Sequence, residues 1–309
     1  MGVFLLIKKL SILLLFVLLL FSACQKRREV KYLFYQPLLK DKIEWERVFF
    51  TMHSLGLKIL ILQWSRYDMV DFIKNKVWLE KILEEAKVQN IQVVVGLYGD
   101  NRYFKNIEDK KLNLPIYFDK LYKINIQQAQ KIYKVAKNFS NFSGWYFVEE
   151  VDDLNFKEKR REKALKVYWK RLSCEIDKVA DRAIYLSAFY GQNSSPQEYA
   201  EMLNRVVPKG VHLLLQSGIG AKLVNLKESK NYMQKFKMSY KGEFSPIVEL
   251  FTIGKKEIIA MEATLVQKQI EFLRDNQIGN SIALFSLRYL FTDELLRAYN
   301  YHKRSKNFR

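Results

Sequence analysis

Apolar, strand-like runs alternate with segments of helical period along almost the whole of this chain. Several runs, such as Lys58-Ile59-Leu60-Ile61-Leu62, are nearly continuous hydrophobic stretches, which is typical of parallel strands buried on both faces. The strand-like runs span residues 32–35, 57–64, 91–98, 144–150, 184–190, 211–216, 245–251 and 281–289. Eight β/α units in about 250 residues predict an α/β fold in the form of a single (β/α)8 TIM barrel.

The boundaries between these units favour a closed barrel. Gly56, Asn90, Gly210 and Gly279 fall just before the second, third, sixth and eighth runs, where a helix must end and the chain must turn back into the sheet. The alternative, an open doubly wound sheet, needs a Gly-rich phosphate loop after the first strand, and Tyr35-Gln36-Pro37-Leu38 is not one. No Pro/Gly/Ser-rich linker divides the chain, so we assign the barrel to residues 31–303 and a basic tail to residues 304–309.

The N-terminal residues have the pattern of an exported lipoprotein. Lys8 and Lys9 precede an apolar run that is too short to span a bilayer, and this run ends in Phe21-Ser22-Ala23-Cys24. Because this ending resembles a bacterial lipobox, we predict a signal peptide at residues 1–23, acylation of Cys24 and a tethered linker at residues 24–30. The protein is then anchored to a membrane of the bacterial cell envelope and faces the periplasm or the exterior. The alternative is an uncleaved membrane anchor, which tethers the same domain on the same side.

The formal net charge of +19 is strongly basic. An exported lipoprotein does not ordinarily meet nucleic acid, and no recognition motif accompanies the charge, so we predict no nucleic-acid partner. A Lys-rich surface near anionic lipid or an acidic glycan fits the charge better, although a compositional bias toward Lys, Ile, Asn, Phe and Tyr also explains it. Besides Cys24 the chain contains only Cys174, so no disulfide is expected, and Cys174 is predicted to be buried in a helix.

Glutamates end the fourth and seventh strand-like runs, at Glu150 and Glu249. In a barrel of this type the active site is built from the C-terminal ends of the strands, so both carboxyl groups are expected at its mouth. Hydrolysis of a glycosidic bond needs one carboxylic acid and one carboxylate on either side of the bond. A single glutamate at a strand end is more often solvated or salt-bridged, but the pair predicts a glycoside hydrolase with Glu150 and Glu249 as catalytic residues.

The other strand ends carry polar and aromatic side chains that suit a sugar. Aromatic rings offer flat apolar faces, while amides and a guanidinium offer hydrogen bonds to hydroxyl groups. Arg288 has a second interpretation, as the ion-pair partner of one of the two glutamates. The predicted substrate-binding residues are Gln36, Gln63, Trp64, Tyr98, Asp100, Glu149, Tyr190, Gln216, Arg288 and Tyr289.

The connection at residues 101–122 is too long for an ordinary βα loop and is rich in aromatic residues. Such a segment either roofs the cleft and stacks its tyrosines on sugar rings, or it packs on the neighbouring helix. Its aromatic residues are Tyr103, Phe104, Tyr117, Phe118 and Tyr122.

A metal-dependent hydrolase is disfavoured, and no cofactor is predicted. The only histidines are His53, His212 and His302, and no two of them share the spacing of metal ligands. His53 lies in the first helical segment, and His212 begins a strand at the end opposite the mouth. The remaining alternative to an enzyme is a non-catalytic, lipid-tethered protein that binds a glycan in the barrel mouth.

Several motifs, in this order, resemble the glycosyl-hydrolase-like barrels of the family called domain of unknown function 4434. The resemblance covers most of the chain, from about Tyr32 to about Tyr289. Its motifs are Trp45-Glu46-Arg47 through Met52-His53-Ser54-Leu55-Gly56-Leu57, Leu62-Gln63-Trp64-Ser65-Arg66-Tyr67-Asp68, Gly144-Trp145-Tyr146 with Glu150-Val151-Asp152-Asp153, Leu215-Gln216-Ser217-Gly218-Ile219-Gly220, and Val248-Glu249-Leu250-Phe251.

The resemblance implies a barrel related to retaining glycosidases whose catalytic residues end strands four and seven. On that basis Glu150 is the acid/base and Glu249 the nucleophile. The residue before the acid/base is commonly an Asn that binds the 2-hydroxyl of the sugar, and here it is Glu149. We expect like charge and burial to raise the pKa of Glu150, whereas Glu249 stays ionised and attacks the anomeric carbon. The predicted partner is a carbohydrate polymer, and the oligomeric state is left open.

Overall fold

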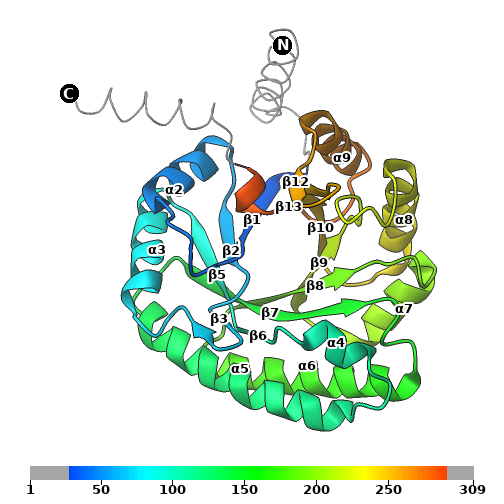
Figure 1. The fold of residues 1–309 in the computed structure, drawn as a ribbon, viewed down its shortest axis with the longest axis horizontal. Helices are drawn as coiled ribbons and strands as arrows, with labels where there is room; N and C mark the ends of the chain where they lie inside the picture. Colours follow the sequence, from blue (N-terminus) through cyan, green and yellow to red (C-terminus); the bar gives the residue numbers. More distant parts are fainter. Residues whose placement is uncertain (1–27, 291–309) are drawn as a thin grey trace.

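The computed structural model describes residues 28–290, and its centre is a closed ring of parallel strands (Figure 1). The ring order is β1, β2, β5, β7, β8, β9, β10 and β13, and β13 pairs with β1 to close it. The eight strands correspond, in order, to the eight predicted runs, so the (β/α)8 barrel is confirmed and the open sheet is excluded. Their bounds are β1 Val30–Tyr35, β2 Ile59–Leu62, β5 Gln92–Gly96, β7 Phe142–Asp152, β8 Ala183–Phe189, β9 Val211–Gln216, β10 Phe244–Glu249 and β13 Ile282–Phe285.

Amphipathic helices surround the ring (Figure 1). Two of them begin with a capping box, in which Ser195 and Asn225 accept hydrogen bonds from the backbone N–H of Glu198 and Glu228, respectively. The helices are α2 Trp45–Ser54, α3 Val77–Val88, α4 Tyr103–Glu108, α5 Leu114–Ala136, α6 Lys159–Val179, α7 Pro196–Val206, α8 Leu226–Ser239 and α9 Ala263–Asp275, and a 3-10 turn follows at Leu287–Tyr289.

Alternation along each strand divides the core into two layers. Residues facing the centre of the barrel pack on one another, for example Phe34 and Tyr146, whose ring centroids are 5.5 Å apart. Residues between them, such as Trp145 and Phe147, face the helices. The inner layer is Tyr32, Phe34, Ile59, Ile61, Val94, Tyr146, Tyr185, Leu214, Ile247 and Ala283. The barrel is therefore filled by side chains, and a ligand can reach it only at its ends.

The end of the barrel opposite the mouth is closed by a polar chain. The His212 Nε2 atom is 2.9 Å from the Ser245 hydroxyl, which is 3.0 Å from the Ser281 hydroxyl. Burial lowers the pKa of His212. His212 thus begins β9 away from the mouth, as predicted, and His53 lies in α2, where its Nδ1 is 3.3 Å from the Gln89 carbonyl oxygen.

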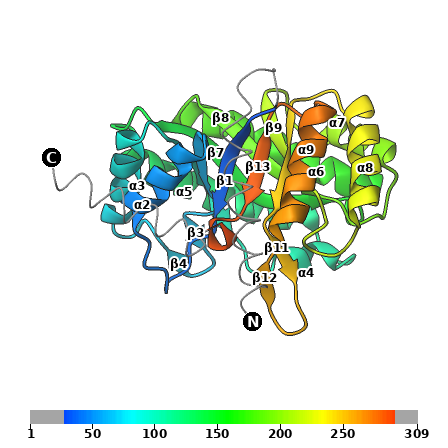
Figure 2. The same ribbon diagram turned by 90° about the horizontal axis from the view of Figure 1, so that it is seen from above.

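The connections at the C-terminal ends of the strands carry additional structure. A three-stranded sheet joins β3 Arg66–Tyr67, β4 Val70–Asp71 and β6 Tyr98–Gly99, and a hairpin pairs β11 Phe251–Ile253 with β12 Ile258–Ala260. Figure 2 shows this hairpin, α4 and β4 on the same side of the barrel, with the hairpin projecting farthest. This side is the mouth.

The connection at residues 101–122 is not a long loop but forms α4 and the beginning of α5. Tyr103, Tyr117 and Phe118 are buried, and Phe118 stacks on Tyr168 of α6 with ring centroids 4.8 Å apart. The Tyr122 ring lies 3.7 Å from the Arg171 guanidinium carbon. These four aromatics therefore pack on neighbouring elements, which was the second interpretation of this segment.

Phe104 differs from these four aromatics, because half of its side chain is exposed.

Cys174 lies in α6, as predicted, but the prediction that it is buried is wrong, because its side chain is exposed. The helix turns its neighbours Leu172, Ser173 and Ile176 toward the core instead. The predicted signal peptide, Cys24, His302 and the basic tail lie outside the described residues. Within residues 28–290, no helix is long and apolar enough to cross a membrane.

The strand ring closes on itself within residues 30–285, and the same stretch supplies its inner and outer core. A unit with its own closed sheet and core has the properties of an independently folding domain.

Gly96 at the end of β5 provides a test of how closely β5 packs against the end of β2 near the mouth. A Cβ atom at Gly96 would lie 2.1 Å from the carbonyl oxygen of Gln63. Because backbone must move to relieve this contact, Gly96→Ala should lower the free energy of unfolding by about 2 kcal/mol or more, measured by urea denaturation. Gly56→Ala is the matched control, since its added Cβ meets open space and only the φ of +74° opposes it. A larger loss for Gly56→Ala than for Gly96→Ala would contradict the packing argument.

Candidate active site

Strand alternation places Glu150 and Glu249 on the inner face of the barrel at its mouth. On β7, Tyr146 belongs to the inner core layer, so Val148 and Glu150 follow on the same face. On β10, Ile247 is in the inner layer and Glu249 follows it. The structure thus brings the two predicted catalytic residues to one site, where the charge of Glu249 acts on Glu150.

Glu150 is half-buried, and side chains of β8 and β9 donate hydrogen bonds to its carboxyl group. The Ser187 hydroxyl of β8 donates a 3.1 Å hydrogen bond to Glu150 Oε1, and it shares a 2.6 Å hydrogen bond with the Tyr146 hydroxyl. Burial raises the pKa of Glu150 to about 7, hydrogen bonds from Ser187 and Gln216 oppose the shift, and the charge of Glu249 adds to it. The prediction of a raised pKa at Glu150 is confirmed.

Glu249 is only 1% exposed, and the β9–α8 connection holds one of its carboxylate oxygens. The backbone N–H of Gly220 and the Ser217 hydroxyl both donate to Oε2, the latter over 3.3 Å. Gly218 and Ala221 add backbone hydrogen bonds. Among the described residues, no group donates a hydrogen bond to Oε1. The carboxylate thus has one oxygen in a nest of donors and one oxygen free of them.

The approach of this loop to Glu249 requires glycine at position 220. A Cβ atom there would lie 2.4 Å from the Phe251 carbonyl oxygen and 3.0 Å from Glu249 Oε2. Burial raises the pKa of Glu249, whereas the surrounding donors act in the opposite direction because they favour the charged form. The sequence predicted an ionised Glu249 but did not indicate this burial.

Glu149 faces the helices rather than the mouth. It lies on the outer face of β7, is 4% exposed, and accepts a 2.8 Å hydrogen bond from the amide of Asn125 in α5. The same amide donates to the Tyr168 hydroxyl over 2.9 Å, and the Tyr98 backbone N–H donates to the Asn125 side-chain oxygen. Burial raises the pKa of Glu149 to about 7. The structure therefore places Glu149 in a buried network between β7 and the helices α5 and α6, and not with Glu150 and Glu249.

The predicted aromatic residues Trp64 and Tyr98 are largely covered by other side chains. Trp64 is 8% exposed, packs on Tyr67 with ring centroids 4.5 Å apart, and donates its indole N–H to the Pro37 carbonyl oxygen. Tyr98 is 7% exposed, with the Arg66 guanidinium carbon 5.3 Å from its ring centre. Both residues shape the wall of the mouth more than they offer open faces to a sugar.

Two polar candidates beside them, Gln63 and Asp100, have different environments. Gln63 is buried, and no group within residues 28–290 donates a hydrogen bond to its side-chain oxygen. Asp100 accepts a 2.8 Å hydrogen bond from the Tyr117 hydroxyl and a 2.9 Å bond from the backbone N–H of Arg102. Asp100 therefore holds the beginning of α4 against α5.

Arg288 pairs with Asp41, and not with Glu150 or Glu249. Its two terminal nitrogens donate to the two Asp41 carboxylate oxygens over 3.0 and 2.6 Å, and one also donates to the Gln36 carbonyl oxygen. The Tyr35 hydroxyl donates to the same carboxylate over 2.8 Å. Burial acts to raise the pKa of Asp41, but hydrogen bonds from Arg288 and Tyr35 outweigh it and lower the pKa. This network joins the turn after β13, which contains Arg288, to the loop after β1, which contains Gln36 and Asp41.

Tyr190 and Tyr289 are partly exposed and lie against other rings. The Tyr190 ring stacks on Tyr232 with centroids 3.4 Å apart, and the Tyr289 ring lies 5.8 Å from that of Phe251. Together with Gln36 and Gln216, they are the predicted substrate-binding aromatics and amides that keep partly exposed surface.

Several residues of the site were not found from the sequence. Ser187 and Tyr146 share the inward direction of Glu150, so strict alternation along β7 and β8 could have identified them. Asp41, Asn125 and Tyr168 lie in loops and helices and reach the site only through tertiary packing. Within residues 28–290, no three His, Cys, Asp or Glu side chains gather as metal ligands would.

Residues 34–285 match the family described as Domain of unknown function (DUF4434). The chain belongs to this family. The resemblance of its motifs is thereby confirmed. This DUF4434 protein is also 26% identical over 269 residues to the uncharacterized protein YbcH of Escherichia coli (strain K12), covering 84% of the chain and 90% of YbcH.

Two solved structures share the barrel of this DUF4434 protein. A protein of Bacteroides thetaiotaomicron VPI-5482, described as a proposed alpha-L-fucosidase, has a TM-score of 0.66 at 15% identity, covering 88% of this chain and 94% of its own. A GH18 chitinase of Pseudoalteromonas aurantia has a TM-score of 0.54 at 9% identity, covering 84% of this chain and 94% of its own. At these identities the likeness is one of fold.

Replacing Glu149 tests whether it is a buried structural carboxyl group. Its pKa of about 7 in the folded protein exceeds its ordinary value of 4.5, so folding binds this proton more tightly. The stabilisation from Glu149 is complete below about pH 4.5 and is lost as the pH rises through about 7. As the pH rises from about 4.5 to 8, the unmodified protein should therefore lose about 3 kcal/mol of unfolding free energy relative to Glu149→Gln. Urea denaturation of both proteins at each pH measures this difference. A difference that stays constant with pH would show that Glu149 titrates normally.

Proposed function

We propose that this DUF4434 protein is a retaining glycoside hydrolase that acts on an extracellular or envelope polysaccharide. The observation that carries the proposal is the different environment of two inward carboxyl groups at one barrel mouth. Glu150 has a pKa of about 7, raised by burial, and so retains a proton close to neutrality. Burial also raises the pKa of Glu249, but the hydrogen bonds that Ser217 and Gly220 donate to Oε2 favour its charged form. One acid and one carboxylate is the requirement for this reaction.

The residues then act in two steps. Glu150 donates its proton to the glycosidic oxygen as the bond to the anomeric carbon breaks, and Glu249 attacks that carbon through Oε1 to form a glycosyl-enzyme. Ionised Glu150 next takes a proton from water, which displaces Glu249 and releases the sugar. Ser187 and Gln216 hold Glu150 in place through their hydrogen bonds to its carboxyl group.

The proposed substrate and location agree with each other. The chitinase that shares this fold is named for a polymer, and the described fucosidase is named for a sugar. A signal peptide at residues 1–23 and acylation of Cys24 would place the barrel at the cell envelope, where polysaccharides occur. The carbohydrate polymer is the proposed partner, and the membrane is reached through Cys24.

A non-catalytic glycan-binding protein is the second candidate, and the burial of Glu249 favours it. With 1% of its surface exposed, Glu249 meets a sugar only if the side chains over Oε1 move. A binding protein needs no such movement.

Glutamine variants of the two carboxyl groups separate these candidates. For an enzyme, Glu249→Gln should abolish turnover because Gln is not a nucleophile, and Glu150→Gln should lower kcat about 10²- to 10⁴-fold because the proton donor is lost. The measurement is hydrolysis of aryl glycosides and bacterial polysaccharides, with proton NMR to assign the first-formed anomer. Glu149→Gln is the matched control, one residue away on the outer face of β7, and should retain activity. Full activity of Glu249→Gln would remove Glu249 from the mechanism, and binding without cleavage by the unmodified protein would favour the second candidate.

Ser187→Ala should shift the pH profile upward. Activity requires protonated Glu150 and should fall as the pH rises through about 7. The Ser187 hydrogen bond lowers the pKa of Glu150, so its removal raises that pKa and moves the alkaline limb of kcat/KM to higher pH. A shift toward lower pH would contradict the assignment of Glu150 as the acid.

A further inference from the structure

The N-terminal end of the barrel carries an excess of positive charge. We define the base as residues 28–31, 55–58, 89–91, 137–141, 180–182, 207–210, 240–243 and 276–281, which lead into the barrel strands. Its carboxylates are confined to Glu29, Asp181 and Glu243. More than twice as many cations accompany them, namely Arg28, Lys31, Lys58, Lys137, Arg182, Lys209 and Lys241.

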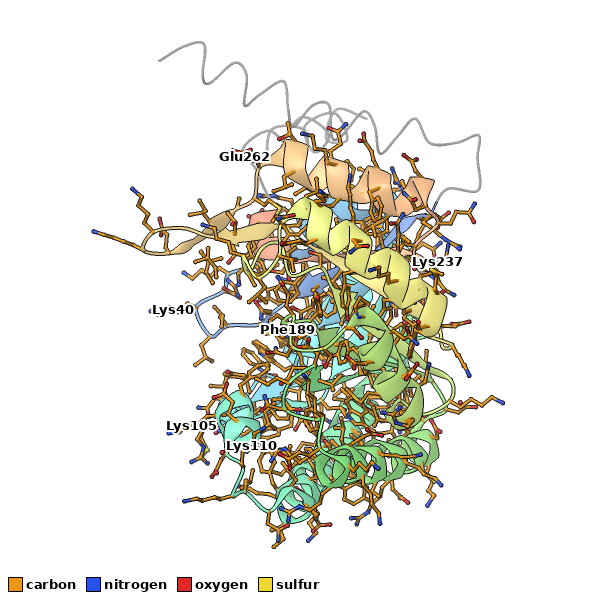
Figure 3. All side chains as sticks on the ribbon, turned by 90° about the vertical axis from the view of Figure 1, so that its right-hand side faces the viewer. Lys40, Lys105, Lys110, Phe189, Lys237 and Glu262 are labelled. Atoms are coloured by element: carbon orange, nitrogen blue, oxygen red, sulfur yellow. The ribbon has the colours of Figure 1, made fainter. Side chains whose placement is uncertain are left out.

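The mouth has no such excess. Basic and acidic side chains are equal in number over its connections, at residues 36–44, 63–76, 97–113, 150–158, 190–195, 217–225, 249–262 and 286–290. The two ends of one barrel therefore differ in charge, although the whole chain is basic. Figure 3 shows Lys237, in the last turn of α8 beside the base, on the opposite side from Lys40, Lys105 and Lys110 of the mouth.

Three lysines of the base point freely into solvent. Lys58, Lys209 and Lys241 precede β2, β9 and β10, and all three are exposed. The ion pairs found within residues 28–290 include none of the three. Val88 and Met238, in the last turns of α3 and α8, add exposed apolar surface at 76% and 85%. The base and the helix turns that lead into it thus offer cations outside ion pairs together with exposed apolar side chains.

The chain reaches the barrel at this same end. Arg28 precedes β1, and the residues before it read Cys24-Gln25-Lys26-Arg27. Arg28 is four positions after Cys24, which allows a span of at most about 14 Å. An acyl group on Cys24 would therefore hold the base, and not the mouth, next to the membrane.

We propose that the base is a docking surface for an anionic lipid bilayer, which leaves the mouth directed away from the membrane. Cations near a membrane of anionic lipids are attracted to it, and their contributions accumulate. A basic surface beside a single lipid attachment converts weak anchoring into stable anchoring. The orientation presents the carboxyl pair to polymers outside the bilayer, and the docking does not depend on the reaction that occurs there.

The mouth is the competing surface, because its loops expose aliphatic side chains. Leu39, Met69 and Ile258 are 75%, 82% and 55% exposed. Taken together, their three loops have no net positive charge, and the tether lies at the other end of the barrel, so the base is the better match to anionic lipid.

The test uses the chain from Gln25 to Arg309, which contains the self-contained barrel and lacks the acylation site. Binding is measured by co-sedimentation with vesicles of phosphatidylcholine, and with vesicles of equal parts phosphatidylcholine and phosphatidylglycerol. The base variant combines Lys58→Glu, Lys209→Glu and Lys241→Glu. The matched control combines Lys40→Glu, Lys105→Glu and Lys256→Glu, which changes the net charge equally at the mouth. Circular dichroism checks the fold, and a milder base set with Gln in place of Glu is measured in parallel.

The unmodified chain should bind only the anionic vesicles, and the binding should weaken as salt increases. The base variant should bind about a hundredfold more weakly, whereas the mouth variant should change less than about fivefold because its charges lie beyond the screening length. Equal binding to both kinds of vesicle, or no binding, would overturn the proposal. A loss in the mouth variant as large as that in the base variant would also overturn it and assign docking to the mouth.

Discussion

The alternation of side chains along the strands of a closed barrel is the constraint on which this site depends. Because the ring has no free edge, each strand presents one set of residues to the centre and the other set to the helices. Glu149 and Glu150 are neighbours in sequence, yet one enters a network with Asn125 and Tyr168 while the other meets Ser187 at the mouth. A shift of one residue in β7 would exchange their roles.

Buried carboxyl groups near the mouth are stabilised in different ways. Asp153 accepts hydrogen bonds from the backbone N–H groups of Gly191, Asn193 and Ser194, and so organises the loop after β8. Glu249 has a similar set of donors on Oε2 and none on Oε1, which leaves Oε1 available for the attack that we propose. Glu149 has fewer donors, and burial raises its pKa to about 7. Burial alone does not make a carboxyl group catalytic; its direction and the arrangement of its donors decide its role.

The two ends of the barrel also differ in their connections and in their charge. The mouth combines the carboxyl pair, the added sheet and the projecting hairpin, while the base contributes short turns and free lysines. A β/α barrel permits short turns at the base and long connections at the mouth, because different loops form its two ends. A net charge of +19 has little meaning as a sum, but its uneven distribution between the two ends of the barrel supports the orientation that we propose at a membrane.

The sequence by itself determined the barrel and the two carboxyl groups, because hydrophobic runs and strand ends are local patterns that a buried parallel sheet requires. It also determined that His212 lies opposite the mouth. Only the tertiary structure decided that Glu149 turns to the helices, that Arg288 pairs with Asp41, that Cys174 is exposed and that the aromatics after β5 pack on helices. The physical reason is that these outcomes depend on which distant segments meet. Local sequence determines whether a residue lies in a helix, a strand or a loop. The distant segments that pack against it determine which residues it pairs with.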